Sequence, residues 1–510
     1  SETNSAVHLL TLNRGGVASG QVALNWTVSG AATGHTVRLE VSLDNGSTWP
    51  VLVAAGIPAN LGEVLWNSTG LPSSPLALWR VVDETDAAVS ATSELNFVLK
   101  NGPVYYYVND ESRTGDVYAD AVGSSTNSGA SPLSPKRWIS EIIDAYNLEP
   151  GDVIYVDTGL YQATAPTTFG ELDAGGIEQD PDEQVNVVGS TNVAAGGTRY
   201  LLASSETAAF HLDETYGVRF SHLAISGASN GLFMDESYFI GGDWLTVQGC
   251  HNGISVQGAS SNLNLAHSVL AGNQNAGIQF SALWFGSMDM GSCVLWSNRY
   301  GIYLDNGYVR TSNSVFGMTR PKSYGLYVLA DASAMGFQGD YNSLYVAQPD
   351  AAVGALQTGS ASTARTSVYA SVSAWTFATG QEGHSLAQDP LLVDPGSGDY
   401  HLKSRGGRYA PGSGWVFDSA SSPLIDAGHP QSMAWTAEPD PNGRRMNVGL
   451  YGGTAEASKT PLSGWITQVS LVDGGSASGI VNLQWAAGGA ATNYTVCIEY
   501  SPDNGITWTN

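Results

Sequence analysis

The chain has 510 residues, only 13% of them charged, and a formal net charge of -26. A surface this acidic repels phosphate backbones and anionic membranes, so we expect no nucleic-acid partner. The sequence contains no apolar stretch of about 18 or more residues, so we also expect no membrane insertion. The 61 glycines follow no Gly-X-Y period, which excludes collagen and favours many turns between short strands. Three cysteines cannot form a disulfide framework, and no zinc-type spacing is present.

The start of the chain recurs at its end. Residues 10–50 and 469–509 align without a gap at an offset of 459, with 22 identities in 41 positions. In each copy a period-two stretch leads into Asp-Asn-Gly and Trp, the pattern of a β-hairpin. About seven short strands are expected in the first copy, as in an immunoglobulin-like or fibronectin-like β-sandwich. We therefore predict a sandwich over residues 1–101 and an incomplete second one over 461–510.

The repeated hairpin contains Ser-x-Asp-x-Gly-x-Thr-Trp. This motif resembles the Asp-box of sialidase propellers, in which the Asp bonds turn amides and the Trp packs beneath. A propeller needs several boxes at regular spacing, whereas this chain has two that lie 459 residues apart. We expect Asp44 and Trp49 to have a structural role in the hairpin rather than a catalytic one.

After the first sandwich the sequence predicts a cap. Pro103 to Val108 reads as a strand, and Ser134-Pro135 opens a helix. The helix carries Ile139, Ile142, Ile143 and Tyr146 on one face. An amphipathic helix before the first coil of a solenoid can cover its open end.

The central segment repeats at nearly constant intervals. A glycine followed by an aliphatic residue recurs at 231, 253, 277, 301 and 325, and apolar residues follow one and three positions later. Period-two strands that repeat every 22 to 24 residues are typical of a parallel β-helix. We expect the glycines at tight corners, and the nearby Asn230, Asn252 and Asn275 as a ladder of stacked amides. The predicted fold is all-β, with a β-helix and its caps over residues 102–460.

Two further stretches carry a resemblance to a known group. The segments "YYYVNDESRTGDVYADA" and "GASPLSPKRWISEIIDAYNLEPGDVIYVDTGLYQ" resemble the entry of right-handed parallel β-helix proteins of secreted and surface-bound bacterial type. The segments "DPLLVDPGSGDYHLKS", "SSPLIDAGHP" and "EPDPNGRRMNVGLYGGTAEAS" resemble their exit. This resemblance implies a right-handed parallel β-helix. It does not choose a function, because such proteins include polysaccharide lyases, epimerases and large repetitive surface proteins.

The charged residues of the coils give no catalytic assignment. A polyuronate lyase needs cations and a base along one outward column, and a glycosidase needs two carboxylates about 5 to 10 Å apart. We expect the charges between residues 217 and 350 not to share a column, and the histidines, His384 and His401 among them, to be scattered without triad or metal spacing. The acids are Asp235, Glu236, Asp243, Asp289, Asp305, Asp331, Asp340 and Asp350, and the bases are Arg219, Arg299, Arg310, Arg320 and Lys322.

Candidate ligand sites are an aromatic group and two acidic segments. Tyr303 and Tyr327, predicted to stack on successive coils with Trp284 on a nearby turn, are candidates for a saccharide platform; packing under a loop is the alternative. No cofactor is predicted. Calcium is a candidate ligand for residues 178–183 and for the group Asp110, Asp116 and Asp120, since it prefers oxygen ligands; solvated acidic loops are the alternative.

The duplicated segment at the two ends of the chain is the basis of the predicted function. A 459-residue unit of sandwich plus β-helix suits a tandem array, so we expect a structural or adhesive module of a very large exported cell-surface or filament protein. It is expected to lie outside the cell or on its surface, to bind glycans or proteins weakly, and to self-associate head to tail, with strand addition to the incomplete domain as one route. The alternative is a secreted carbohydrate-active enzyme, a lyase or epimerase, with a catalytic β-helix.

Overall fold

The computed structural model describes residues 5–170, 184–202, 207–283, 286–330, 336–359, 363–461, 465–468, 470–471, 477–488, 495–502 and 507–509. The chain divides into two compact units, which are described separately. Unit 1 comprises Ser1–Gly159 and Leu172–Ala195, and unit 2 comprises Leu160–Glu171 and Gly196–Asn510. Nearly all regular structure in both units is β, which confirms the predicted fold class.

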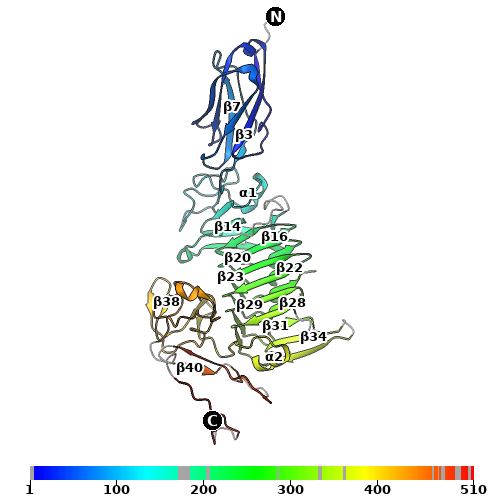
Figure 1. Ribbon diagram of the computed structural model, residues 1–510, viewed down its shortest axis with the longest axis vertical. Coiled ribbons are helices and arrows are strands. Elements are labelled where there is room, and N and C mark those ends of the chain that lie inside the picture. The colour runs from blue at the N-terminus through cyan, green and yellow to red at the C-terminus, as the bar shows by residue number, and fades with distance from the viewer. Residues whose placement is uncertain are drawn as a thin grey trace. The chain divides into compact units, whose positions relative to one another are not determined.

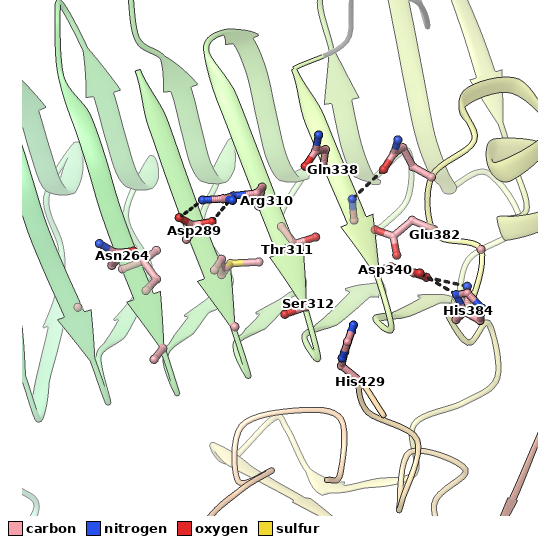
Figure 2. A pocket seen from close by; sticks show the side chains of 18 of the residues that line it. Asn264, Asp289, Arg310, Thr311, Ser312, Gln338, Asp340, Glu382, His384 and His429 are labelled. Carbon is pink, nitrogen blue, oxygen red and sulfur yellow. Dashed lines mark hydrogen bonds and ion pairs between the residues drawn. The ribbon is translucent and has the colours of Figure 1, made fainter. Parts of the chain in front are cut away.

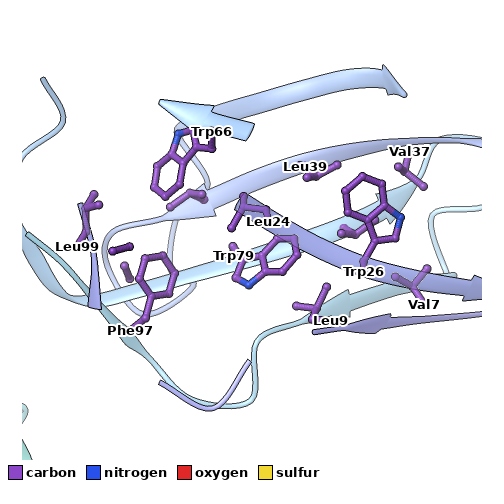
Figure 3. Close-up of a cluster of buried hydrophobic side chains, with 14 of the residues drawn as sticks. Val7, Leu9, Leu24, Trp26, Val37, Leu39, Trp66, Trp79, Phe97 and Leu99 are labelled. Carbon is purple, nitrogen blue, oxygen red and sulfur yellow. The ribbon is translucent and has the colours of Figure 1, made fainter. Parts of the chain in front are cut away.

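The first hundred residues of unit 1 form two sheets around one core (Figure 3). Period-two alternation buries one face of each strand, and Trp26, Trp79 and Phe97 fill the space between the sheets. Membership of the immunoglobulin class stays a prediction. The strands are β1 (Ala6–Leu9), β3 (Gln21–Ser29) and β6 (Glu63–Asn67) in one sheet, and β2 (Val17–Ala18), β9 (Phe97–Leu99), β7 (Ser74–Asp83), β4 (Thr36–Ser42) and β5 (Val51–Pro58), with β8 (Ser90–Thr92) on β7, in the other.

The Asp-box hairpin uses its polar groups locally. Asp44 accepts hydrogen bonds from the Ser42 hydroxyl at 2.7 Å and from the Thr48 amide at 2.8 Å. The Thr48 hydroxyl bonds its second oxygen at 2.5 Å, and these bonds lower the pKa of Asp44. The carboxylate is thus engaged in the turn, as its predicted structural role requires.

The rest of unit 1 contains the predicted cap. Helix α1 (Ile139–Ala145) buries Ile139, Ile142 and Ile143. It begins at Ile139 because the Glu141 carboxylate accepts from the Arg137 and Trp138 amides at 3.0 and 3.2 Å. Three parallel strands follow each other in one sheet: β10 (Tyr105–Val108), β11 (Val153–Val156) and β14 (Val185–Gly189).

Unit 2 is a parallel β-helix with three sheets, one on each side of the coil (Figure 1). Sheet 1 in this unit contains β17 (Val218–Ser221), β20 (Tyr238–Asp243), β23 (Ser261–Ala266), β26 (Ser287–Gly291), β29 (Tyr308–Ser312) and β32 (Phe337–Asp340). Sheet 2 contains β12 (Gly159–Ala163), β15 (Thr198–Leu202), β18 (Leu223–Ser226), β21 (Thr246–Gln248), β24 (Val269–Ala271), β27 (Val294–Trp296), β30 (Val315–Met318) and β33 (Ser343–Val346). Sheet 3 contains β13 (Thr167–Phe169), β16 (Ala208–Asp213), β19 (Asn230–Asp235), β22 (Asn252–Gln257), β25 (Ala276–Ser281), β28 (Tyr300–Asn306), β31 (Tyr324–Val328), β34 (Ala352–Thr358) and β35 (Arg365–Tyr369).

The glycine repeat lies on sheet 3, and its apolar columns are in register as predicted. Ile254 pairs with Ile278, and Ile278 with Ile302. The expected role of the glycines was wrong in one respect: they lie inside the strands, not at corners. A Cβ on Gly253 would stand 2.5 Å from the carbonyl oxygen of Gly277 on the next coil, so close approach of the backbones excludes a side chain.

The predicted amide ladder is also present on sheet 3. The Asn252 amide donates to Asn230 Oδ1 at 3.0 Å, and the Asn275 amide donates to Asn252 Oδ1 at 2.9 Å. Each side chain thus satisfies a polar group on the neighbouring coil.

The last coil is closed by an antiparallel strand and a helix. Strand β35 pairs with β34. Helix α2 (Val372–Thr379) is capped by Ser371, whose hydroxyl accepts from the Ala374 backbone amide. Trp375 is fully buried against Gly354, where a Cβ would come within 2.5 Å of the indole. The buried indole covers the end of the β-helix core.

The chain then folds back along sheet 2. This exit segment, residues 386–460, packs Leu424, Ile425 and Val448 on Val294 and Val315, which lie on the outer face of that sheet. Its elements are β36 (Leu392–Asp394), β37 (Asp399–Leu402), β38 (Arg408–Ala410), β39 (Gly414–Val416) and the 3-10 helix η4 (Met433–Ala437). Other 3-10 helices in the described residues are η1 (Gly30–Gly34), η2 (Ala59–Leu61) and η3 (Val193–Ala195).

The second copy contains a strand pair that corresponds to one in the first copy. Strand β40 (Trp465–Gln468) pairs with β41 (Trp485–Gly488), with Trp465 opposite Gly488. In the first copy Ala6 is opposite Ser29, the same register at an offset of 459. The Asp-Asn-Gly turn of this copy lies outside the described residues. The predicted domain boundaries and strand addition stay predictions.

Candidate functional site: a charged groove on sheet 1

A groove that encloses about 870 Å³ crosses the outer face of sheet 1 (Figure 2). Its floor comes from the strands of sheet 1, and its walls come from the loop after α2 and from the exit segment. The polar residues that line it are Arg219, Asn264, Asp289, Arg310, Thr311, Ser312, Gln338, Asp340, Gln381, Glu382, His384 and His429.

The floor is one column of outward positions, which carry polar side chains at every level except Gly241. Through the parallel register, Arg219 is level with Gly241, Gly241 with Asn264, and Asn264 with Asp289. The column continues through Arg310 to Gln338. The expectation that the charges of the coils share no column was therefore wrong: three of them lie in this column, which we call the groove column.

The groove column was not predicted from the sequence for a geometric reason. Successive members of the groove column are separated by 22, 23, 25, 21 and 28 residues, because the loops between strands differ in length. On sheet 3 the spacing is nearly constant, so its columns can be read from the sequence. The signal that could have found the groove column is strand alternation within each short segment, not the period between segments.

Arg310 and Asp289 form the central ion pair of the column. Asp289 lies 2.6 Å from Arg310 Nε and 2.7 Å from Nη2, and this pairing raises the pKa of the guanidinium. Their side chains remain 65% and 46% exposed. An exposed pair contributes only about 0.2–1 kcal/mol to stability, so its place in the groove is not explained by folding.

His384 and Asp340 form a second pair, at the wall. Asp340 ends β32, and His384 follows helix α2. The His384 amide donates to Asp340 Oδ1 and its Nδ1 lies 2.7 Å from Oδ2. Tyr341 stacks on the imidazole, with 4.7 Å between centroids and 5° between planes. The ring is therefore fixed on one edge and on one face.

Beside this pair, Glu382 is buried under the wall and accepts from the Asn342 amide at 3.0 Å on each oxygen and from the Ser385 hydroxyl. Burial raises the pKa of Glu382 to about 7, against the lowering effect of Ser385 and Asn342, and Asp340 adds to the rise. The backbone amide of Glu382 donates to the backbone carbonyl of Gly339, and this hydrogen bond attaches the wall to β32.

His429 forms the opposite side of the groove. Its ring lies edge-on to Tyr341, at 4.7 Å between centroids and 68° between planes. Its amide donates to the buried Asn313 side chain at 2.7 Å, and its Nδ1 accepts from the Gln431 amide at 3.2 Å. Asn313, at φ 53°, thereby holds the exit segment against the edge of sheet 1.

The predicted aromatic site lies on sheet 3, away from the groove column. Tyr303 and Tyr327 do stack, at 5.4 Å between centroids and 5° between planes, and Tyr300 and Tyr324 pack beside them. Trp284 lies outside the described residues. Because the two rings face each other, they offer edges and hydroxyls outward, and the Tyr327 hydroxyl bonds Gln357. A saccharide at this cluster stays a prediction.

Of the calcium candidates, the structure describes only the group Asp110, Asp116 and Asp120. Among the described residues, no three His, Cys, Asp or Glu side chains come together in a group that could hold a metal ion. Asp116 accepts from the Asn109 amide, and Asp110 from the Ser112 amide. Residues 178–183 lie outside the described part of the chain.

A family described as "Disaggregatase related" matches residues 364–428, the stretch that contains α2 and His384. No curated protein matches the chain.

Similar solved structures include three proteins. Pectate lyase Pel9A is 16% identical over 69% of this chain and 97% of its own, with a TM-score of 0.36. An alginate lyase from Paenibacillus is 13% identical over 43% of this chain and 87% of its own, with a TM-score of 0.31. The catalytic unit of an alpha-1,3-glucanase from Streptomyces thermodiastaticus is 12% identical over 67% of this chain and 71% of its own, with a TM-score of 0.29.

In the described part of the chain, no helix is long and apolar enough to cross a membrane.

Proposed function

We propose that unit 2 binds an extended polysaccharide along the groove column. The observation that carries this proposal is the outward series of planar polar side chains from Arg219 to Gln338, which is interrupted only at Gly241. Parallel strands stand about 4.8 Å apart, so the column offers donors and acceptors over roughly 24 Å. Guanidinium, carboxylate and amide groups in such a row can each bond two neighbouring sugar hydroxyls.

The mixed charge of the column bears on the class of ligand. Asp289 neutralises Arg310, and Asp243 lies 3.7 Å from Arg219. With a net charge of -26 on the whole chain, a neutral or sparsely charged polysaccharide is favoured over a dense polyanion.

Binding is tested by affinity electrophoresis in gels containing xylan, a neutral β-glucan or polygalacturonate. We expect at least one of the neutral polymers to retard the protein. Gln338→Ala and Asn264→Ala should each weaken retardation about five- to tenfold, the equivalent of one or two lost hydrogen bonds. Gln257→Ala is the matched control, since Gln257 is an exposed glutamine on sheet 3. Equal weakening by the Gln338 and Gln257 variants, or no retardation in any gel, would contradict the proposal.

The expected structural and adhesive role is compatible with this binding. A repeated unit that carries a saccharide groove would act as an adhesin, and export to the cell surface remains part of that hypothesis. The alternative, a carbohydrate-active enzyme, is favoured by one separate observation, the His384–Asp340 pair at the groove wall.

A further inference from the structure

We infer that His384 acts as the general base in the hydrolysis of acyl esters carried by the bound polysaccharide. The inference rests on the proposed saccharide binding for its natural substrate, an O-acylated glycan.

The hydrogen bonds give the two histidines opposite tautomers. A carboxylate only accepts, so Nδ1 of His384 is the protonated nitrogen that donates to Asp340, and in the neutral ring Nε2 has the lone pair. Nδ1 of His429 accepts from the Gln431 amide, so Nε2 of His429 carries its proton. Both imidazoles line the groove (Figure 2). Both also contact the Tyr341 ring. The groove thus has an acceptor and a donor beside one ring.

The other charged groups of the groove are committed to partners. Asp289 is paired with Arg310 and Asp340 with His384, and Glu382 is buried. Among the lining residues that the structure describes, no two unpaired carboxylates are therefore available for glycosidic hydrolysis. Both lining arginines, Arg219 and Arg310, have a carboxylate within 3.7 Å, which leaves a uronate carboxylate poorly neutralised. A base oriented by a carboxylate remains, and that arrangement suits acyl transfer to water.

The reaction balances with water alone. Nε2 of His384 takes a proton from a water molecule as the water oxygen bonds the acyl carbon. The carbonyl oxygen becomes an oxyanion, which accepts a hydrogen bond from Nε2–H of His429. The bond from the acyl carbon to the sugar oxygen then breaks, and the sugar oxygen takes the proton from His384. The products are a carboxylic acid and a free sugar hydroxyl. Asp340 acts as a positioning residue, because it fixes the tautomer of His384.

The test measures hydrolysis of p-nitrophenyl acetate and acetate release from acetylated xylan by the full chain. His384→Gln should lower kcat at least about a hundredfold for both substrates. His251→Gln, a change at an exposed histidine outside the groove, should leave both rates unchanged. Asp340→Asn should lower kcat about tenfold or more with little change in KM, whereas a merely structural defect would change the melting temperature and KM as well.

The outcomes separate this inference from the proposed function. Binding of xylan without acetate release, or equal rates for the His384 and His251 variants, would overturn the inference and leave saccharide binding intact. Hydrolysis of the aryl ester that depends on His384, without retardation by any polysaccharide, would support the inference and contradict the proposed function.

Discussion

Two buried glutamates hold protons near neutral pH. Burial raises the pKa of Glu382 to about 7 despite its hydrogen bonds to Ser385 and Asn342. Burial also raises the pKa of Glu438 to about 7, although Gly453 and Asn447 amides donate to it. In the unfolded chain both groups titrate near 4.5. The folded state therefore binds more protons than the unfolded state between about pH 4.5 and about pH 7, and stability falls as pH rises through this window.

Replacement of Glu382 by Gln should remove the part of the pH-dependent loss of stability that Glu382 causes. A shift of this size corresponds to at most about 3 kcal/mol, so wild type should lose more stability than Glu382→Gln between pH 5 and pH 8. The amide keeps an acceptor for Asn342 and gives Ser385 a donor. Urea unfolding at the two pH values measures the difference. Glu214→Gln, at an exposed position, should follow wild type; if Glu382→Gln also follows wild type, the raised pKa is contradicted.

The strands of sheet 3 show why the fold could be predicted and the site could not. Their spacing of 22 to 24 residues made the columns from Leu232 to Leu326 visible in the sequence, and the register confirms them. Sheet 1 has the same architecture, but loops of unequal length obscure its column. The groove also joins Asp340 to His384 and His429, which follow it by 44 and 89 residues. No local pattern encodes contacts of that separation, so the histidines read as scattered.

The glycines within the strands of sheet 3 should not tolerate replacement by any residue with a side chain. In Gly253→Ala the new Cβ would meet the Gly277 carbonyl at 2.5 Å, and a shift of the coil would be needed to relieve the contact. We expect the free energy of unfolding to fall by about 1–3 kcal/mol, as for other overpacked sites. Urea denaturation checks this. Gly383→Ala is the control, since nothing lies within 4 Å of its Cβ position; a similar loss in both variants would refute close approach as the reason for glycine.

At the scale of the whole molecule, the groove depends on the exit segment. This segment is far from sheet 1 in sequence, and its apolar side chains cover the outer face of sheet 2. One edge of it carries His429, which the Asn313 side chain holds at the corner between the two sheets. The exit segment therefore covers the apolar outer face of sheet 2 and also supplies a wall of the groove. Loss of its packing should weaken ligand binding.

Ile425→Ala tests this coupling between the exit segment and the groove. Ile425 is fully buried in the contact with sheet 2, and its truncation should weaken the docking by about 2–4 kcal/mol. Amide hydrogen exchange should speed up in residues 422–451, and polysaccharide retardation should weaken because His429 is no longer held in place. Phe377→Ala is the control, since that ring is 89% exposed on α2. Faster exchange with undiminished binding would show that the groove column on sheet 1 holds the ligand without this wall.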